Sequence, residues 1–500
     1  MRFSEIFSQA GVTPIALAGD AEVTSMVMDT RRLSAGGLFV CMPGTTTDSH
    51  SYLAPAVSAG AVAAIVYSAD GFAEATRLGL AAAQLPSSKQ EFADVIWRVC
   101  DAFFEHPTRE MKVVGVTGTN GKTTTAWLIR DTLQALGVKA AYLGTLGFQL
   151  PGEERELANT TPFAVDLYNL LAEARDKGVE ALAMEVSSHA LKERRVEGVE
   201  FDVGVFTNLT QDHLDYHGSM EDYEASKRRL FLELPSQTEK HFVAALNMDD
   251  TGAASLAHDF EGKKVLYGAA DCSYDLGLES VSVAVDRITG RMCAGSTEVD
   301  FEAQLGGSYN VENLLSATAA LMGLGYELGY IANALSEAIP VPGRFEAVPN
   351  GAGIGILVDY AHTPDALEKL LDAVKPLTKG RVITVFGCGG DRDRTKRPKM
   401  ALAASERSDV TVATSDNPRT EDAQAILDEV LTGIQAGRES IAIIDRGEAI
   451  SHAVCIARPG DVVVIAGKGH ENYQIIGRTK YPMDDRELAR RGLEARAAAA

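Results

Sequence analysis

The sequence predicts an α/β protein with several domains, the last of which is built on a doubly wound parallel sheet. Apolar strand-like runs alternate with helical patterns throughout residues 341–500. Earlier in the chain, a glycine-rich turn joins a strand-like run to a helical pattern within residues 112–136. At about 100–200 residues per domain, the 500 residues predict about three domains, which we place at residues 1–108, 109–340 and 341–500.

The first region, residues 1–108, has the pattern of a small mixed α/β domain. Its strand-like runs are Glu22–Met28, Gly37–Met42 and Ala61–Tyr67, and Pro43-Gly44 turns the chain after the second run. Alanine-rich segments next to these runs favour helices. We therefore expect a short sheet with helices between its strands.

The central region, residues 109–340, opens with a βαβ unit. An apolar run at Lys112–Val116 precedes the glycine-rich turn, a helical pattern covers Thr123–Leu136, and a second strand follows at Val138–Leu143. A βαβ unit implies parallel pairing and a sheet that is buried on both faces. Two further strands end at Glu185 and near Asn208.

The last region, residues 341–500, shows the most regular alternation. Helical patterns such as Pro364–Leu377 and Glu421–Gly433 separate the strands, which predicts the doubly wound parallel sheet. The predicted strands are Ile354–Asp359, Arg381–Phe386, Asp409–Thr414, Ser440–Asp445 and Asp461–Ala466.

Composition and charge restrict the possible partners and location. The formal net charge of −22 argues against an extended nucleic-acid surface, because such surfaces concentrate Lys and Arg. No stretch approaches the roughly 20 apolar residues that cross a bilayer, and the N-terminus lacks an apolar signal-peptide run. The six cysteines form no CxxC pair, so we expect reduced thiols in a cytoplasmic protein. We expect a monomer that acts on small molecules, with no nucleic acid and no membrane insertion.

The strongest local motif is Gly115–Thr123, with the sequence GVTGTNGKT between a strand and a helix. Glycines let the backbone approach phosphate oxygens, and the N–H groups at a helix start face the anion. Lys122 is suited to the β- and γ-phosphates of a nucleotide, and the Thr123 hydroxyl is suited to Mg²⁺. Val116 occupies the first glycine position of the usual pattern, but Lys-Thr after Gly121 favours phosphate binding.

Three further segments carry candidate metal ligands. Glu185 ends a predicted strand and is suited to Mg²⁺ together with Thr123, the alternative being a solvated carboxylate at the sheet edge. The segment Asn208–His217 is dense in polar residues, and its Asp212, His213, Asp215 and His217 fit either a metal or phosphate site or a surface turn. Lys227, beside Arg228 and Arg229, has by itself the pattern of a solvated basic helix face.

Four polar clusters follow predicted strands of the last region, where the carboxyl ends of parallel strands form a ligand-binding edge. Arg392 and Arg419 have planar guanidinium groups suited to a carboxylate, while Asp416 and Glu471 suit an ammonium group. The pattern therefore predicts a pocket for a small zwitterion, the alternative being that each cluster is an ordinary loop turn. The four clusters are Asp359–His362, Gly387–Arg392, Asp416–Arg419 and Gly467–Glu471.

Together these motifs resemble the Mur ligase family, and the resemblance extends from about Asp29 to Arg486. It implies a three-domain architecture with a nucleotide-sugar domain, a central P-loop ATPase domain and a C-terminal Rossmann-like amino-acid domain. It also implies an ATP-dependent ligase that forms an amide bond through an acyl phosphate in peptidoglycan synthesis. The residues that carry the resemblance are Gly118–Thr125, Glu185–His189, Asp212–His217, Asn310, Asn313, Pro342–Glu346, Asp359–His362, Asp416–Arg419 and Gly467–Glu471.

The resemblance implies roles for individual residues, with ATP and Mg²⁺ as cofactors. The residues implied for ATP are Gly118, Thr119, Asn120, Gly121, Lys122, Thr123, Thr124, Asn310, Asn313, Arg344, Asp359 and His362. The implied metal ligands are Thr123, Glu185, His213 and a carbamylated Lys227. The implied catalytic residues are Lys122, Glu185, His213 and Lys227. The residues implied for the UDP-sugar substrate are Thr30, Asn159, Thr160, Thr161, Ser187, Glu193 and Arg195.

The Asp-Asn-Pro-Arg motif at Asp416–Arg419 is similar to that of family members that add meso-diaminopimelate to UDP-N-acetylmuramoyl-L-alanyl-D-glutamate. Arg419 is suited to the carboxylate that distinguishes diaminopimelate from lysine. A lysine-adding Mur ligase and a P-loop regulatory ATPase remain as alternatives. The residues implied for diaminopimelate are Arg392, Asp416, Asn417, Pro418, Arg419, Gly467 and Glu471.

Overall fold

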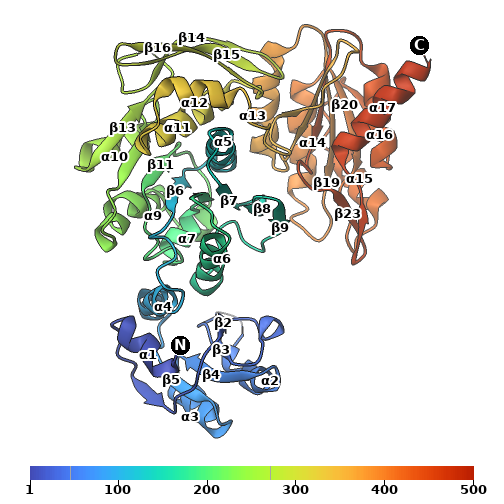
Figure 1. The fold of residues 1–500 in the computed structure, drawn as a ribbon. Helices are drawn as coiled ribbons and strands as arrows, with labels where there is room; N and C mark the ends of the chain where they lie inside the picture. The colour runs from blue at the N-terminus through green and yellow to red at the C-terminus, as the bar shows by residue number, and fades with distance from the viewer. Residues whose placement is uncertain (45–46, 271, 500) are drawn as a thin grey trace. The chain divides into compact units, whose positions relative to one another are not determined.

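The computed structural model describes residues 1–44, 47–270 and 272–499 of the chain. Its sheets contain mostly parallel strands joined by helices, which confirms the predicted α/β class (Figure 1). The chain divides into two compact units, each made of two segments. The first unit is Met1–Leu276 with Leu315–Ile331, and the second is Gly277–Leu314 with Ala332–Ala500.

The first unit begins with a five-stranded sheet in the order β1-β5-β4-β3-β2. Strands β2 to β5 pair in parallel, and β1 is antiparallel to β5. The strands are β1 (Ala16–Ala18), β2 (Ser25–Val27), β3 (Gly37–Val40), β4 (Ala61–Val66) and β5 (Ala81–Gln84). The helices of this region are α1 (Phe3–Gln9), the 3₁₀ turns η1 (Thr30–Arg32) and η2 (Ser49–Tyr52), α2 (Leu53–Ser58), α3 (Ala69–Arg77) and α4 (Lys89–Phe103).

The larger sheet of the first unit has eight strands in the order β13-β12-β11-β6-β10-β7-β8-β9. All its pairs are parallel except those of β8 and β9, which extend one edge as antiparallel strands. The strands are β6 (Lys112–Thr117), β7 (Ala140–Gly144), β8 (Gly147–Leu150), β9 (Glu153–Arg155), β10 (Ala181–Glu185), β11 (Val203–Phe206), β12 (Val243–Asn247) and β13 (Lys263–Tyr267).

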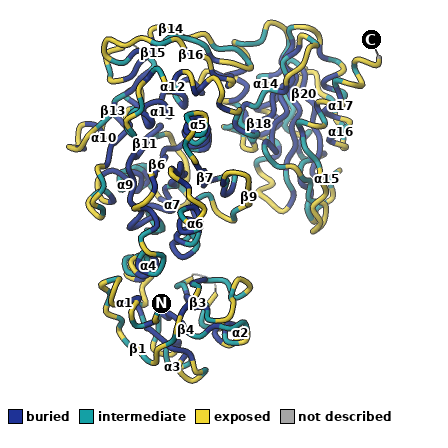
Figure 2. Tube along the Cα trace, in the orientation of Figure 1, coloured by how far each residue is buried: buried dark blue, intermediate teal, exposed yellow. Residues whose placement is uncertain are grey.

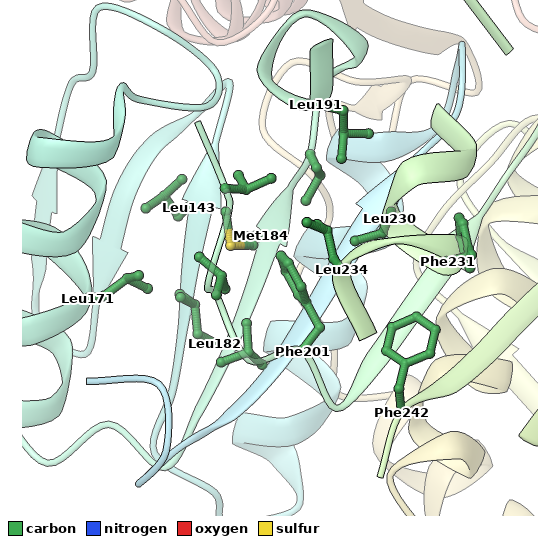
Figure 3. Close-up of a cluster of buried hydrophobic side chains, with 14 of the residues drawn as sticks. Leu143, Leu171, Leu182, Met184, Leu191, Phe201, Leu230, Phe231, Leu234 and Phe242 are labelled. Atoms are coloured by element: carbon green, nitrogen blue, oxygen red, sulfur yellow. The ribbon is translucent and has the colours of Figure 1, made fainter. Parts of the chain in front are cut away.

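Helices accompany this sheet, and its central strands β6, β10 and β11 are buried (Figure 2). The apolar cluster on one face includes Met184 of β10, Phe201 just before β11 and Leu230 of α9 (Figure 3). Burial on both faces explains why these strands are continuous apolar runs. The helices of this region are α5 (Lys122–Ala135), α6 (Ala164–Asp176), α7 (Ser188–Lys192), α8 (Leu214–His217), α9 (Met220–Leu232), η3 (Leu234–Gln237) and α10 (Thr251–Asp259).

The second unit contains a six-stranded sheet in the order β17-β18-β22-β19-β20-β21. Strands β18 to β22 pair in parallel, and the short β17 is antiparallel to β18. The strands are β17 (Glu346–Ala347), β18 (Gly355–Asp359), β19 (Val382–Cys388), β20 (Val410–Ser415), β21 (Glu439–Ala442) and β22 (Val462–Ala466). The helices around them are α13 (Pro364–Val374), η4 (Lys375–Leu377), α14 (Lys396–Arg407), α15 (Ala423–Leu431), α16 (Arg446–Ile456) and α17 (Asp485–Ala499).

Two antiparallel elements of the second unit have no counterpart in the sequence prediction. The first is a three-stranded sheet of β14 (Gly277–Val283), β15 (Ile288–Ala294) and β16 (Thr297–Ala303). The second is a hairpin of β23 (Tyr473–Ile476) and β24 (Thr479–Pro482). Helix α11 (Tyr309–Gly323) continues from the second unit into the first, and α12 is Leu328–Leu335.

A buried ion pair ties together two strand ends of the six-stranded sheet. Arg446 and Asp485 begin α16 and α17, and both side chains have 0% exposure. The Arg446 guanidinium donates to both Asp485 oxygens, at 2.8 and 2.6 Å. It also donates to the Ser415 carbonyl at 3.4 Å and the Ala466 carbonyl at 3.0 Å. These carbonyls end β20 and β22, directly before the predicted amino-acid clusters.

Breaking this pair is expected to destabilise the second unit strongly. Arg446→Met leaves the Asp485 carboxylate buried and unpaired, which costs about 3–5 kcal/mol. The double variant with Asp485→Leu is expected to regain most of that loss, because an apolar pair has no uncompensated charge. Calorimetric unfolding of both variants measures this. Arg394→Met, which removes an ion pair at the surface, is the control and is expected to unfold as the wild type does. Equal losses in the single and double variants would contradict the account.

The cysteine prediction is partly wrong. Four cysteines are free thiols, whereas Cys272 and Cys293 are disulfide-bonded. The lack of a CxxC spacing did not exclude a disulfide. No helix within the described residues has the length and apolar character needed to cross a membrane. The free thiols are Cys41, Cys100, Cys388 and Cys455.

Candidate active site

The predicted phosphate loop joins β6 to α5. Gly118 has φ +144°, and a Cβ there would lie 1.9 Å from the Thr207 hydroxyl oxygen, so the turn needs glycine. Gly121 is the N-cap of α5 in a left-handed conformation. Because it has no side chain, the first N–H groups of the helix have no side-chain acceptor from their own cap. This geometry is that of an anion cradle.

The end of β11 supports the loop from the side. The Asn208 carbonyl accepts from the Thr119 N–H at 2.8 Å, and the Asn208 side chain accepts from the Asn120 N–H at 2.9 Å. Lys122 lies over the loop and donates to the carbonyls of Gly118 and Thr119, at 3.0 and 2.9 Å. The supporting role of Asn208 was not predicted, because a strand-end asparagine is ordinary in sequence.

Glu185 is buried at 1% exposure beside the phosphate loop, since β10 pairs in register with β6. Its Oε1 accepts from the Tyr142 hydroxyl and, at 2.8 Å, from the Thr145 N–H. Its Oε2 accepts from the Thr145 hydroxyl at 3.2 Å. A carboxylate oxygen accepts about two hydrogen bonds, so Oε1 is saturated and Oε2 keeps one acceptor position. The carboxylate is thus buried and held by hydrogen bonds to both oxygens, and the alternative of a solvated edge carboxylate is wrong.

The family resemblance implies that Glu185 binds Mg²⁺, and in that role Tyr142→Phe is expected to weaken Mg²⁺ use about 10- to 100-fold, the usual effect of losing a partner that orients a metal ligand. The variant lacks the phenol hydroxyl that holds Oε1, so of these partners only Thr145 still holds the carboxylate. The readout is the Mg²⁺ concentration that gives half-maximal ATP-dependent turnover, together with Mn²⁺ binding measured by paramagnetic resonance. Tyr168→Phe is the matched control, because that buried hydroxyl donates to the Glu197 carbonyl instead. A metal affinity of Tyr142→Phe equal to that of the wild type would contradict this role of Tyr142.

Helix α9 places Lys227 under the phosphate loop. The side chain is buried at 1% exposure, and its Nζ donates to the Gly118 carbonyl at 2.6 Å. Burial, with the Lys122 ammonium as a second cause, lowers the pKa of Lys227 well below its usual value. The interpretation of Lys227, Arg228 and Arg229 as a solvated basic face is therefore wrong, because α9 packs against β6 and α7. The arginine side chains are only 16% and 11% exposed.

The Asp- and His-rich segment divides into two parts. His213 has a left-handed backbone (φ 51°), is 47% exposed and meets the His189 ring edge-on at 4.8 Å. His217 is buried and bonds Ser188 at 3.0 Å and Asp222 at 3.2 Å, so it holds α8 in place. Among the described residues there is no group of three or more His, Cys, Asp and Glu positioned to hold a metal.

The residues implied for the UDP-sugar substrate gather mainly at the end of β10. The Thr161 hydroxyl donates to the Glu185 carbonyl at 2.9 Å and accepts from the Ser187 N–H at 3.2 Å. Arg195 donates to the Thr161 carbonyl at 2.9 Å and pairs with Glu193 at 2.6 Å. Burial raises the pKa of Glu193, but hydrogen bonds from Lys89 and Arg195 outweigh it, and the net shift is downward.

The other members of this set lie around that group or apart from it. Thr160 lies 3.3 Å from the Thr145 hydroxyl, and Asn159 is exposed beside it. Thr30 is on η1 of the N-terminal region, where its neighbour Arg32 pairs with Asp166 of α6 at 2.6 Å. The structure therefore brings Thr160, Thr161, Ser187, Glu193 and Arg195 together and ties η1 to helix α6.

The second-unit residues that the family resemblance implies for ATP contact other residues of that unit. The Asn313 side chain donates to that of Asn310 at 2.8 Å, and both are buried. Asp359 accepts from the Phe345 and Ala361 N–H groups at 2.7 and 2.8 Å, and burial raises its pKa. Arg344 lies over the Tyr360 ring at 4.8 Å. His362 has its pKa lowered by burial.

The four polar clusters of the second unit meet at one sheet edge, because β18, β22, β19 and β20 are parallel neighbours. The Gly467 N–H donates to the Asp359 carbonyl at 3.0 Å, and Arg419 donates to the Gly390 carbonyl at 2.8 Å. The Asn417 amide donates to Glu471 at 2.9 Å. Contacts thus link all four clusters, which favours one pocket over independent loop turns.

One residue of this edge was not singled out from the sequence. Lys468 has 0% exposure, and its Nζ donates to Asn417 Oδ1 at 3.1 Å and Glu471 Oε2 at 3.0 Å. Since the Asn417 amide also donates to Glu471 Oε2, that oxygen is satisfied within the protein.

The comparisons with known proteins decide the family. The Mur ligase middle domain matches residues 116–321, and the Mur ligase glutamate ligase domain matches residues 343–469. The UDP-N-acetylmuramoyl-L-alanyl-D-glutamate--2,6-diaminopimelate ligase of Trichormus variabilis is 46% identical over 480 residues, covering 95% of each chain. That of Geobacter metallireducens is 44% identical over 485 residues, covering 93% of each. This chain belongs to the Mur ligase family.

Solved structures place this Mur ligase in the same fold group. A UDP-N-acetylmuramoyl-L-alanyl-D-glutamate--2,6-diaminopimelate ligase structure matches with TM-score 0.68 and 32% identity, covering 95% of both chains. The MurF ligase from Thermotoga maritima in complex with ADP matches with TM-score 0.63 and 17% identity, covering 95% of this chain and 98% of the other. The second likeness is one of fold alone. Both support the multi-domain Mur architecture expected from the sequence.

Proposed function

We propose that this chain uses ATP to join meso-diaminopimelate to UDP-N-acetylmuramoyl-L-alanyl-D-glutamate in peptidoglycan synthesis. The observation that carries the proposal is the linked amino-acid edge, where Arg419 contacts the Gly387–Arg392 cluster and Asn417 contacts Glu471. This edge combines guanidinium and carboxylate groups, which a doubly acidic amino acid requires. The relatives named above carry this activity in their names.

The phosphate loop supplies the ATP end of the reaction. The N–H groups at the start of α5 bind the β- and γ-phosphates of ATP. When ATP binds, Lys122 Nζ gives up its hydrogen bonds to the Gly118 and Thr119 carbonyls and binds the same phosphates. The D-glutamyl carboxylate attacks the γ-phosphorus in line, and ADP leaves. Lys122 then stabilises the charge that develops on the transferred phosphoryl group.

Residues around the loop fit Mg²⁺. Thr123, at the start of α5, and Oε2 of Glu185 provide hard oxygen ligands, and Mg²⁺ at nucleotide sites usually takes its remaining ligands from phosphates and water. We place His213 at a second metal position. When bound, Mg²⁺ neutralises phosphate charge during transfer. Glu185 is held for this role by Tyr142 and Thr145.

We propose that Lys227 is carbamylated in the active enzyme. Reaction with CO₂ needs the neutral amine, and burial favours that form by lowering the pKa of Lys227. The modification replaces the ammonium with a carboxylate-like group, which is suited to a metal. Intact mass measured with and without bicarbonate tests it, and Lys227→Met is the control that removes the added mass.

The acceptor and the amino acid complete the reaction. Thr30, Asn159, Thr160, Thr161, Ser187, Glu193 and Arg195 hold the UDP-sugar dipeptide. The amine of diaminopimelate attacks the acyl-phosphate carbonyl, and the tetrahedral intermediate expels inorganic phosphate. Glu471 and Asp416 hold the ammonium group that does not react, and Arg419 pairs the distal carboxylate. In this arrangement lysine leaves Arg419 without its carboxylate partner.

A panel of amino acids tests the proposal. Purified protein receives ATP, the UDP-sugar dipeptide and one amino acid at a time, and both phosphate and amide product are measured. The expected result is product with meso-diaminopimelate and at least about 100-fold lower kcat/KM with lysine. A preference for lysine would assign the lysine-adding activity. A rate of ATP hydrolysis that is the same with and without each amino acid would assign a regulatory P-loop ATPase.

A further inference from the structure

The β23–β24 hairpin follows the last amino-acid cluster and lies against the Asp416–Arg419 loop. Backbone contacts join them: the Arg419 N–H donates to the Ile475 carbonyl at 3.0 Å, and the Gly477 N–H donates to the Arg419 carbonyl at 2.7 Å. Arg419 forms an isolated parallel bridge with Ile476 of β23. The hairpin therefore holds both sides of the Arg419 peptide.

This support matters because Arg419 has an unusual backbone. Its φ of 53° lies in the left-handed region that side-chain-bearing residues rarely occupy. Such a conformation persists when the surroundings determine it. The same backbone directs Nη1 to the Gly390 carbonyl at 2.8 Å, and a Cβ on Gly389 would lie 2.8 Å from that nitrogen. The position of the guanidinium is thus set by the backbone of Arg419 and by the close approach of Gly389.

The hairpin also orients the two residues at the start of the loop. The Gln474 amide donates to the Asp416 carbonyl at 2.6 Å and to the Ser415 hydroxyl at 3.4 Å. The Ile475 N–H donates to Asn417 Oδ1 at 2.9 Å. Because Oδ1 accepts from Ile475 and Lys468, the amide nitrogen of Asn417 faces Glu471. Strand β23 therefore influences the cationic and the anionic parts of the amino-acid pocket.

We infer that the β23–β24 hairpin is a specificity-determining element of the amino-acid site, with Gln474 as a positioning residue. This inference rests on the proposed function of the Asp416–Arg419 loop. Gln474 fixes the Asp416 peptide, the hairpin backbone fixes Asn417 and Arg419, and the loop then presents one guanidinium at a defined distance from Glu471. Losing the Gln474 donor leaves the Asp416 carbonyl without that bond and lets the loop shift.

Two substitutions test the role of Gln474. Gln474→Met keeps the length of the side chain but removes the donor, and Gln474→Glu places an acceptor against the Asp416 carbonyl. Both are expected to raise KM for meso-diaminopimelate about tenfold or more, with KM for ATP and for the UDP-sugar dipeptide unchanged. The preference for meso-diaminopimelate over lysine is expected to fall by a similar factor, with the larger effect in Gln474→Glu.

The control is Thr479→Ala, on the exposed strand β24 of the same hairpin, which is expected to behave as the wild type. Thermal unfolding and ADP binding establish that each variant is folded. If the Gln474 variants are folded and keep the wild-type preference, or if all three KM values rise together, the inference is overturned. If Gln474→Glu does not fold, the KM values and the amino-acid preference of Gln474→Met decide the test. A wild-type enzyme that does not use meso-diaminopimelate would instead refute the proposed function.

Discussion

Lys122→Ala is expected to lower kcat/KM for ATP by about 10²–10³-fold, the usual effect of removing one preorganised group that stabilises transition-state charge. Lys122 Nζ lies over the phosphate loop and donates to the Gly118 and Thr119 carbonyls. Without it, the charge on the transferred phosphoryl group loses the cation that the proposed mechanism assigns to it. Initial rates of phosphate release at varied ATP concentration measure the effect.

The control for Lys122 is Lys263→Ala, on the edge strand β13 of the same sheet, where the side chain is exposed. That variant is expected to keep wild-type kinetics. Thermal unfolding of Lys122→Ala distinguishes lost chemistry from a lost loop, since the ammonium also ties two loop carbonyls. A folded Lys122→Ala enzyme with less than a tenfold loss would contradict the assigned role.

Arg419→Ala is expected to reduce kcat/KM for meso-diaminopimelate about 100-fold while changing the lysine reaction much less. Hydrogen bonds to a charged group contribute about 1.5–3 kcal/mol, and lysine has no second carboxylate to lose that contribution. The two rates measured in competition give the ratio directly. This substitution therefore reports on the discrimination between the two amino acids.

Arg394→Ala is the matched control for Arg419, because it removes a more exposed arginine near the same edge that pairs with Glu429. It is expected to leave the preference unchanged. Two results would contradict the role of Arg419. One is an equal fall for both amino acids, and the other is an unchanged preference in a folded variant.

The sequence predicted the parallel strands well for a physical reason. β10, β18, β19, β20 and β22 are buried on both faces, so their sequences are mainly apolar, and a polar segment follows each of them in the chain. The strand ends in turn located the phosphate loop and the four polar clusters. Edge elements were predicted less well: β21 is Glu439–Ala442, whereas Ser440–Asp445 was expected. A mostly exposed edge strand has a weaker apolar pattern.

Antiparallel elements and tertiary support were harder to predict. The β23–β24 hairpin does carry a signal, Gly477-Arg478 between β-branched residues, but its position against Arg419 depends on contacts that sequence spacing does not contain. Lys227 illustrates the same limit. Three consecutive basic residues usually lie in solvent, and only the packing of α9 against β6 and α7 buries this one. Tyr142 likewise acts through Glu185 on another strand, and Asn208 acts through Thr119 and Asn120 of the phosphate loop.

The central claim is that one oxygen of the D-glutamyl carboxylate passes to phosphate through an acyl phosphate. The direct measurement uses the UDP-sugar dipeptide labelled with ¹⁸O in that carboxylate, ATP and meso-diaminopimelate, with mass analysis of the phosphate released. The account predicts one ¹⁸O atom per phosphate, formed in step with the amide. Unlabelled phosphate accompanying amide product would contradict it.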